Sequence, residues 1–215
     1  EAAVRPFGVA HRDVLKIAIP MMIAYLSTPL VGLVATGVIA HMRNEALVGG
    51  VALASVIFDV IFVTFNFLRG ATTGFTAQAM GAGDRVGEQR MLLSGLIIAL
   101  VAGLLLLLLQ GPIGALGMSV MGAEGIVAEA ASTYFHWRIW SAPFVLFNFV
   151  AFGWLIGRGE AMWSMILQTL LNGLNAALSV HWVIGLGWGV EGVAIATLVA
   201  EAVTAVAGAA FFLSP

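Results

Sequence analysis

The sequence has no cysteine and very few charged residues. Only 9% of its 215 residues are Asp, Glu, Lys or Arg, whereas 61% are apolar. Without cysteine, a disulfide framework, a thiolate metal site and a thiol nucleophile are all excluded. Soluble domains carry about 25% charged residues, so water cannot be the solvent for most of this surface. The composition therefore predicts an integral membrane protein, and the mean hydropathy of +1.04 supports this prediction.

Basic residues and chemical motifs are also scarce. The 9 Lys and Arg are outnumbered by 11 Asp and Glu, which gives a net charge of −2. Nucleic-acid-binding proteins need a basic face for the phosphates, so no nucleic-acid partner is expected. The chain also has no His-x-x-x-His metal motif and no nucleophile turn flanked by glycines. We expect no enzyme activity, no catalytic residue, no metal site and no cofactor other than a coupling H⁺ or Na⁺.

Six apolar stretches are long enough to cross a bilayer as helices, which need about 20 mostly apolar residues each. They cover approximately residues 17–40, 46–80, 91–109, 133–157, 162–184 and 192–213. The predicted fold is an all-α integral membrane protein, a bundle of six transmembrane helices over residues 17–213. Residues 1–16 are predicted to form a cytoplasmic juxtamembrane segment, held at the anionic leaflet by basic side chains.

Lys and Arg are distributed unevenly between the two ends of this predicted bundle. The N-terminal segment and the second and fourth loops contain Arg5, Arg12, Lys16, Arg85, Arg90 and Arg158. The loops at the opposite end contain only Arg43. Because short loops rich in Lys and Arg stay in the cytoplasm, both the N-terminus and the C-terminus are predicted to be cytoplasmic.

Polar side chains recur at regular spacing within four spans, although each one costs free energy unless it faces protein or water. Their spacing places them in stripes along the helices. The stripes are Asp59, Asn66 and Thr73 in the second span, Thr133, His136 and Trp140 in the fourth, Gln168, Asn172, Asn175 and Ser179 in the fifth, and Thr197, Glu201 and Thr204 in the sixth. Such stripes serve either as hydrogen-bonding contacts between helices or as the lining of a shared pathway. We favour a pathway because four helices carry them.

Asp59 and Glu201 are the acidic members of these stripes, and either could load and release a proton inside the membrane. The alternative is that each forms an ion pair with Arg69 or Arg138. Asp59 and Arg69 are ten residues apart in one span, too far to pair with each other, so any partner must come from another span.

Prolines and glycines mark two further features of the spans. Pro20 and Pro29 lie in the first span, where each removes a backbone donor and bends the helix. They predict either a gate or a static kink. The spacing of Gly153 and Gly157 matches the small-xxx-small pattern of closely packed membrane helices.

Several segments carry motifs that are more specific than hydrophobicity. They are Ala18–His41, Phe67–Ala79, Gly81–Asp84, Arg138–Pro143, Asn172–Asn175 and Gly192–Glu201. In order and spacing they resemble the multidrug and toxic compound extrusion (MATE) transporters, in the DinF-like branch. The resemblance implies a secondary transporter of two six-helix lobes, in which this chain is similar to the N-terminal lobe and a second lobe is expected. It also implies a multi-pass protein of the bacterial inner membrane that exports cationic or amphipathic small molecules, by alternating access, in exchange for H⁺ or Na⁺.

Two positions depart from the family pattern. Ala35 and Ser179 stand where the family usually has Asp, and those carboxylates are the family's candidate proton or Na⁺ sites in this lobe. Asn175 and Thr197 match neutral members of the same cluster. We hypothesise that Asp59 supplies part of the missing acidity. The alternatives are an uncoupled or non-transporting membrane module, and a lipid-precursor flippase of the same superfamily, which would need a cationic cavity.

Overall fold

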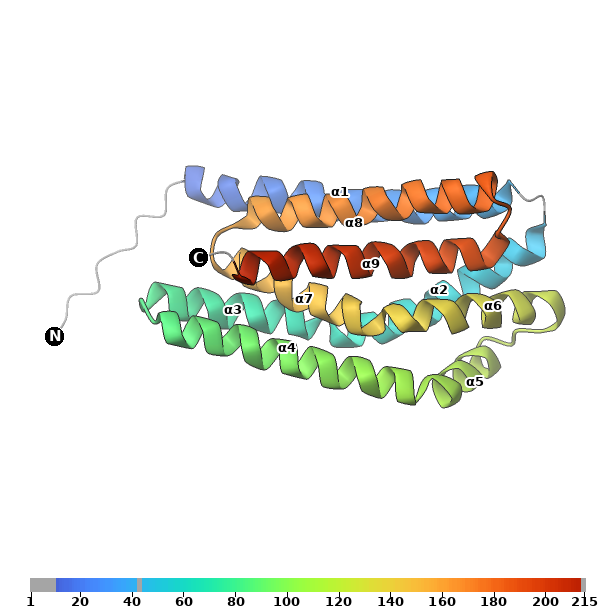
Figure 1. Cartoon of the computed structure of the whole chain (residues 1–215), viewed down its shortest axis with the longest axis horizontal. Coiled ribbons are helices and arrows are strands. Elements are labelled where there is room, and N and C mark those ends of the chain that lie inside the picture. The colour runs from blue at the N-terminus through green and yellow to red at the C-terminus, as the bar shows by residue number, and fades with distance from the viewer. Residues whose placement is uncertain (1–10, 42–43, 214–215) are drawn as a thin grey trace.

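The structure is a computed structural model that describes residues 11–41 and 44–213, and in this part of the chain every regular element is a helix (Figure 1). The α-helices are α1 (His11–Ala40), α2 (Glu45–Phe65), α3 (Phe67–Gly81), α4 (Arg85–Leu108), α5 (Gln110–Val120), α6 (Gly125–Arg138), α7 (Ala142–Gly157), α8 (Ala161–Val180) and α9 (Gly189–Leu213). A 3₁₀ turn, η1 (Ile139–Ser141), joins α6 to α7, and a π-helical turn, η2 (His181–Gly185), follows α8. Arg5 and Arg43, which contributed to the predicted orientation, lie outside the described residues.

Two of the predicted spans each consist of two helical segments in the structure. α3 follows α2 across Asn66, and α7 follows α6 across η1. Among the described residues, four helical stretches are long and apolar enough to cross a membrane: Glu45–Gly81, Arg85–Leu108, Gly125–Gly157 and Gly189–Phe212. Shorter apolar stretches, Val14–Ala24 and Val31–Ala40, lie in α1. α8 is 20 residues long, but the amide and hydroxyl side chains of its polar stripe lower its mean hydropathy.

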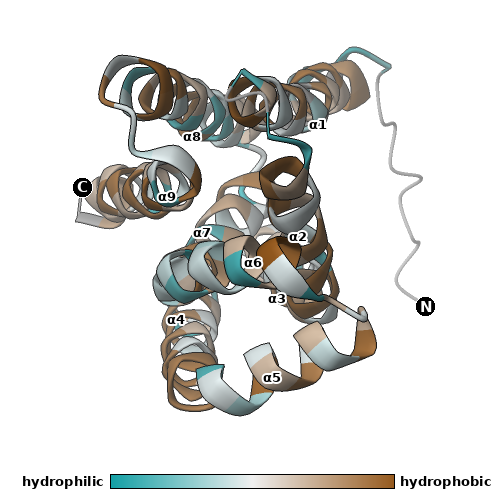
Figure 2. Ribbon diagram, turned by 90° about the vertical axis from the view of Figure 1, so that its right-hand side faces the viewer, coloured by the Kyte–Doolittle hydropathy of each residue, from teal (hydrophilic) through white to brown (hydrophobic). Residues whose placement is uncertain are grey.

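The helix boundaries differ from the sequence-based ones at two places. α1 begins at His11, so the helix includes residues 11–16, which were assigned to the juxtamembrane segment. Residues 110–120 form α5, which runs across the end of the bundle, where the sequence predicted only a break (Figure 2). Pro112 fits within the first turn of α5, because the first four N–H groups of a helix have no intrahelical acceptor anyway.

α7 is the central helix of the bundle. It packs against α3, α4, α8 and α9, and most of its residues are buried. α1 and α8 lie side by side along one side of the bundle, and α3 and α4 lie along the other (Figures 1 and 2). The α3–α4 and α7–α8 loops lie at the same end as the start of α1 and the end of α9 (Figure 1). This is the end that carries the basic residues Arg12, Arg85 and Arg158.

Arg158 connects three helices at this end. Its Nη1 forms an ion pair with Glu88 Oε1 in the first turn of α4, at 2.8 Å, and its Nε pairs with Glu160 Oε1 at 3.0 Å. The guanidinium also lies over the Trp154 ring, 4.5 Å from its centroid. The loop between α7 and α8 is thereby attached to the start of α4.

Two glycines allow α7 to approach α3 closely. A Cβ added at Gly153 would lie 2.6 Å from the carbonyl oxygen of Arg69, and one added at Gly157 would lie 2.7 Å from the carbonyl oxygen of Thr73. Neither position has room for a side chain. The small-xxx-small spacing of these glycines therefore marks a tight helix contact, which also fixes the position of Arg69.

The outer surface of the bundle is apolar, as contact with lipid requires. On α4, the exposed side chains Leu93, Ile97, Leu100, Leu104 and Leu108 follow one helical face. Soluble monomeric proteins rarely expose an apolar face of this extent. It fits the hydrocarbon of a bilayer.

Candidate functional site

A cavity of about 940 Å³ opens between the α1–α8 pair and the remaining helices. Side chains of α1, α2, α3, α6, α7, α8 and α9 line it. The polar and charged lining residues are Thr36, Ser55, Asp59, Arg69, Tyr134, Arg138, Asn148, Gln168, Asn172, Asn175, Thr197 and Glu201. Ligand-binding pockets have volumes of about 300–1,000 Å³, so the cavity is large enough for a drug-sized molecule.

Most residues that the sequence singled out for a pathway lie on this cavity. They are Pro29, Ala35, Asp59, Arg69, Arg138, Gln168, Asn172, Asn175, Thr197 and Glu201. Side chains that are far apart in the sequence therefore surround one space. The stripes of the fifth and sixth spans contribute half of its amide and hydroxyl side chains, namely Gln168, Asn172, Asn175 and Thr197.

Some of the selected residues lie elsewhere. Asn66 is exposed and ends α2, where its backbone N–H donates to the carbonyl of Val63, and it is not among the lining residues. Thr73 donates its hydroxyl to the carbonyl of Arg69 in its own helix, at 2.8 Å. Of the stripe predicted along the second span, only Asp59 therefore lines the cavity.

The fourth span also differs from its predicted stripe. His136 and Trp140 are exposed and absent from the cavity lining, whereas Tyr134 and Arg138 line it. Thr204 of the sixth span is fully buried away from the cavity. Pro20 lines a separate hollow near the basic end of α1.

A chain of neutral hydrogen bonds includes Ser179, one of the two positions at which the resemblance implies a carboxylate. The Ser179 hydroxyl donates to Asn175 Oδ1 at 3.4 Å, and Asn175 Nδ2 donates to Thr197 Oγ1 at 3.0 Å. Thr197 Oγ1 donates in turn to the carbonyl of Val193 at 3.1 Å. Ser179 is 0% exposed and lies behind Asn175. The chain connects α8 to α9 without any ionisable group.

Asn148 of α7 holds the one acidic side chain of α9 that reaches the cavity. Its Nδ2 donates to Glu201 Oε2 at 2.7 Å and to the backbone carbonyl of Glu201 at 3.1 Å. Asn148 is 1% exposed as a residue. Asn148 was not among the residues predicted from the sequence, although an isolated amide within the apolar run 142–152 is a signal of the same kind as the stripes.

Two arginines of the cavity wall are positioned by aromatic rings. The Arg138 guanidinium lies 4.7 Å from the Phe58 ring centroid and 5.4 Å from that of Tyr134, and its Nη1 donates to the Tyr134 hydroxyl at 2.9 Å. The Arg69 guanidinium lies 5.4 Å from the Phe152 ring centroid. Stacking of this kind is a favourable cation–π contact.

The cavity carboxylates form no direct ion pair with these arginines, although Arg138 interacts electrostatically with Glu201. Within the described residues, neither Asp59 nor Glu201 lies within ion-pair distance of a guanidinium. Asp59 is exposed to the cavity. The alternative that each carboxylate forms an ion pair with an arginine of another span is therefore not what the structure shows.

Comparison with known proteins decides the family. The MatE family model matches residues 20–181. The chain belongs to the MatE family. Among its MatE relatives, the DNA damage-inducible protein F of Escherichia coli is 40% identical over 192 residues, covering 89% of this chain and 42% of that protein. The multidrug export protein MepA of Staphylococcus aureus is 24% identical over 202 residues, covering 94% of this chain and 44% of that protein.

Solved MATE structures share the fold. A transporter of the MOP superfamily from Pyrococcus furiosus, described as having a binding pocket of reverse polarity, matches with a TM-score of 0.87 and 29% identity over 94% of this chain and 44% of that one. The outward-facing conformation of a multidrug resistance MATE transporter matches equally well, with a TM-score of 0.87. The chain thus spans about half the length of its MatE relatives. As a MatE protein it is a multi-pass bacterial membrane protein from a family of transporters, not of enzymes.

Proposed function

We propose that this chain is one lobe of a secondary active efflux transporter that exports cationic or amphipathic small molecules in exchange for H⁺ or Na⁺. The observation that carries the proposal is the convergence of Asp59, Asn172, Asn175, Thr197 and Glu201 on one cavity of an otherwise apolar bundle. Polar groups at membrane depth are costly unless water, protein or a ligand satisfies them. A cavity lined by several such groups therefore supports a transport pathway better than a structural seam.

A second six-helix lobe completes the transporter in this proposal, because the relatives are about twice as long as the chain. The end of the bundle that carries Arg12, Lys16, Arg85 and Arg158 would face the cytoplasm, in keeping with the distribution of basic residues in short loops. Both ends of the chain would then lie on the cytoplasmic side.

Bending of α1 would change the volume of the cavity during alternating access. Pro29 lines the cavity, and Pro20 lies nine residues earlier in the same helix. Each proline removes one backbone hydrogen bond, so α1 has fewer internal restraints at these positions than its neighbour α8. The two prolines are the proposed gating positions.

We assign ion coupling to Asp59 and Glu201. Ala35 has no polar group, and the Ser179, Asn175 and Thr197 side chains offer only neutral oxygens that already participate in hydrogen bonds. Asp59, in contrast, is an ionisable group that reaches the cavity without an ion pair in the described part of the chain.

The test is dye export by the protein with both lobes, reconstituted into liposomes under an imposed pH gradient. Asp59→Asn preserves the shape of the side chain and removes its ionisable group, so export driven by the gradient should fall to the background rate. Glu129→Gln removes an exposed carboxylate of α6 outside the cavity, and it should export as the parent does.

Three outcomes would count against parts of the proposal. If Asp59→Asn still exports in response to the gradient, Asp59 is not a coupling residue. If the double variant Asp59→Asn, Glu201→Gln still does so, the assignment of coupling to these two carboxylates is refuted. No export by the parent under either a pH or a Na⁺ gradient would favour the non-transporting module.

A further inference from the structure

A second hollow lies outside the cavity, where α1 packs against α8 near the basic end of the bundle. Figure 1 shows that α1 extends past the start of α8 at this end. The hollow has a volume of about 450 Å³ and is lined by Arg12, Leu15, Lys16, Ile19 and Pro20 of α1 and by Met162 of α8. None of these residues lines the cavity described above. Leu15, Ile19 and Met162 are about half exposed, so the hollow opens to the outside of the bundle.

The hollow combines two cationic side chains with an apolar wall. Arg12 and Lys16 are four residues apart in α1 and exposed, and side chains at this spacing lie on one helix face, one turn apart. Leu15, Ile19 and Met162 form the apolar part. Among the described residues that line the hollow there is no carboxylate. A ligand that fits it therefore has a negative group and an apolar chain.

The first turn of α8 indicates the depth of the hollow in the bilayer. Trp163 follows Met162 in this turn and is half-exposed, with its ring centroid 4.8 Å from that of Phe211 near the end of α9. Tryptophan is enriched at the headgroup level of membrane proteins. Since α1 enters the bundle from this end, Lys16 lies nearer the headgroups, and Ile19 lies nearer the hydrocarbon. Lysine and arginine stems can cover apolar surface while their charged ends stay at the interface.

Other basic residues at this end have different surroundings. Arg158 forms ion pairs with Glu88 and Glu160. Arg85 and Arg90 belong to α4, on the side of the bundle away from α1 (Figure 2). Arg12 and Lys16, in contrast, adjoin an apolar hollow between two helices. A basic site between membrane helices on the cytoplasmic side is the arrangement that binds anionic lipid headgroups.

We propose that this hollow binds one anionic phospholipid. Its phosphate lies between Arg12 and Lys16, and one acyl chain lies against Leu15, Ile19 and Met162. The phosphate oxygens accept charge-assisted hydrogen bonds from both cationic side chains. A zwitterionic lipid is bound less tightly, because its headgroup also carries a cation that these side chains repel. The lipid contacts both α1 and α8 and so joins them at the headgroup level. The site is separate from the cavity and does not depend on the proposed function.

The test is photolabelling of the protein with both lobes in nanodiscs of phosphatidylcholine. One probe is phosphatidylglycerol with a diazirine in one acyl chain, and the other is phosphatidylcholine with the same acyl chain. Mass spectrometry of peptides locates the label. Phosphatidylglycerol should label residues 12–20 and the first turn of α8 at least about tenfold more than phosphatidylcholine does, because each cation near an anionic lipid contributes about fivefold. Nanodiscs carry the probe in both leaflets, so the result does not depend on the orientation of the protein.

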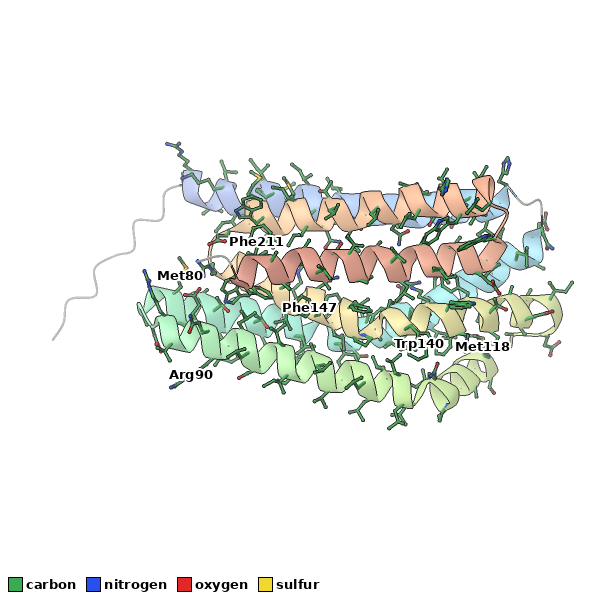
Figure 3. The ribbon with its side chains drawn as sticks, viewed as in Figure 1. Met80, Arg90, Met118, Trp140, Phe147 and Phe211 are labelled. Atoms are coloured by element: carbon green, nitrogen blue, oxygen red, sulfur yellow. The ribbon has the colours of Figure 1, made fainter. Side chains whose placement is uncertain are left out.

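Variants connect the lipid preference to the two cations. The double variant Arg12→Gln, Lys16→Gln should lower labelling by phosphatidylglycerol to the level of phosphatidylcholine. The exchange Arg12→Lys, Lys16→Arg keeps both charges and should keep the preference. The matched control is Arg85→Gln, Arg90→Gln, which removes two exposed cations from α4 at the same end. Arg90 projects away from the bundle (Figure 3), and this variant should be labelled as the parent is.

Three results would each overturn the proposal. The first is equal labelling of α1 and α8 by the two probes in the parent. The second is an unchanged preference in Arg12→Gln, Lys16→Gln. The third is labelling that avoids both helices, which would mean that another part of the protein or a second copy fills the hollow. Excess inorganic phosphate should leave the labelling unchanged, and loss of labelling would identify the ligand as a soluble anion instead of a lipid.

Discussion

The contact between α3 and α7 yields a prediction that can be worked out from single atoms. In Gly153→Ala the new Cβ would lie 2.6 Å from the carbonyl oxygen of Arg69 and 3.2 Å from Thr72 Cβ. The nearest atom belongs to the backbone, so no side-chain rotation can relieve the overlap. α7 must instead move away from α3.

The size of the effect follows from two opposing terms. Overpacking a well-packed interior costs about 1–3 kcal/mol. We expect the upper part of this range, because Gly157 makes an equally close contact one turn later, at 2.7 Å from the carbonyl oxygen of Thr73, and prevents a compensating tilt. The better helix propensity of Ala returns up to about 1 kcal/mol. The net loss in the free energy of unfolding should be about 2 kcal/mol.

The assay is unfolding of the purified chain by increasing SDS in mixed micelles, followed by circular dichroism. Gly173→Ala in α8 is the control, because an added Cβ there meets no atom within 4 Å, and this variant should be as stable as the parent or more stable. If Gly153→Ala loses no more stability than Gly173→Ala, the two helices do not approach as closely as described, and the reasoning is refuted.

Two further predictions concern the buried polar contacts of α8 and α9. Glu201→Leu removes the side-chain acceptor of Asn148 and should lower the free energy of unfolding by about 1–3 kcal/mol. Glu201→Gln keeps an acceptor and should cost less in the same SDS titration, and equal losses would contradict the assigned hydrogen bond. Ser179→Asp places a carboxylate at a fully buried position, where a charge needs a counter-charge. Its melting temperature should fall below that of the parent and recover more in sodium chloride than in choline chloride, whereas no recovery specific to Na⁺ would mean that the hydrogen-bond chain has no space for a cation.

Periodicity explains why the fifth and sixth spans were informative. In α8 and α9 an otherwise apolar helix carries amides, hydroxyls and one carboxylate at intervals of three or four residues, and such spacing can only place them on one face. Asn172, Asn175, Thr197 and Glu201 accordingly share the cavity. Asn66 and Thr73 have the spacing of the same stripe but do not line the cavity: Asn66 is exposed at the end of α2, and the Thr73 hydroxyl donates to the carbonyl of Arg69 within α3. Periodicity shows which side chains share a helix face, not how far along that face the cavity extends.

Contacts between helices could not be read from the sequence, because periodicity describes one helix at a time. The partner of Glu201 is Asn148, 53 residues away, and nothing in the local pattern connects the two. Whether Asp59 forms an ion pair with an arginine depends on the distance between side chains of different helices, which the sequence does not give. The aromatic rings that hold Arg138 come from α2 and from its own helix, so the positions of its neighbours emerge only when the bundle is assembled.

The ion pairs of Arg158 determine how the cavity walls can separate. Arg158 and Glu160 flank a single glycine between α7 and α8, and Glu88 attaches the same point to α4. The loop between α7 and α8 is therefore short and held by ion pairs, so these two helices cannot separate at this end. A displacement of the α1–α8 pair away from α7 would pivot at Arg158 and have its largest amplitude at the opposite end, where α8 passes into the π-helical turn. At that end η2 joins α8 to α9 and Trp182 stacks on Trp188, so α9 would move together with α8 and the Asn175–Thr197 bond between them would be retained.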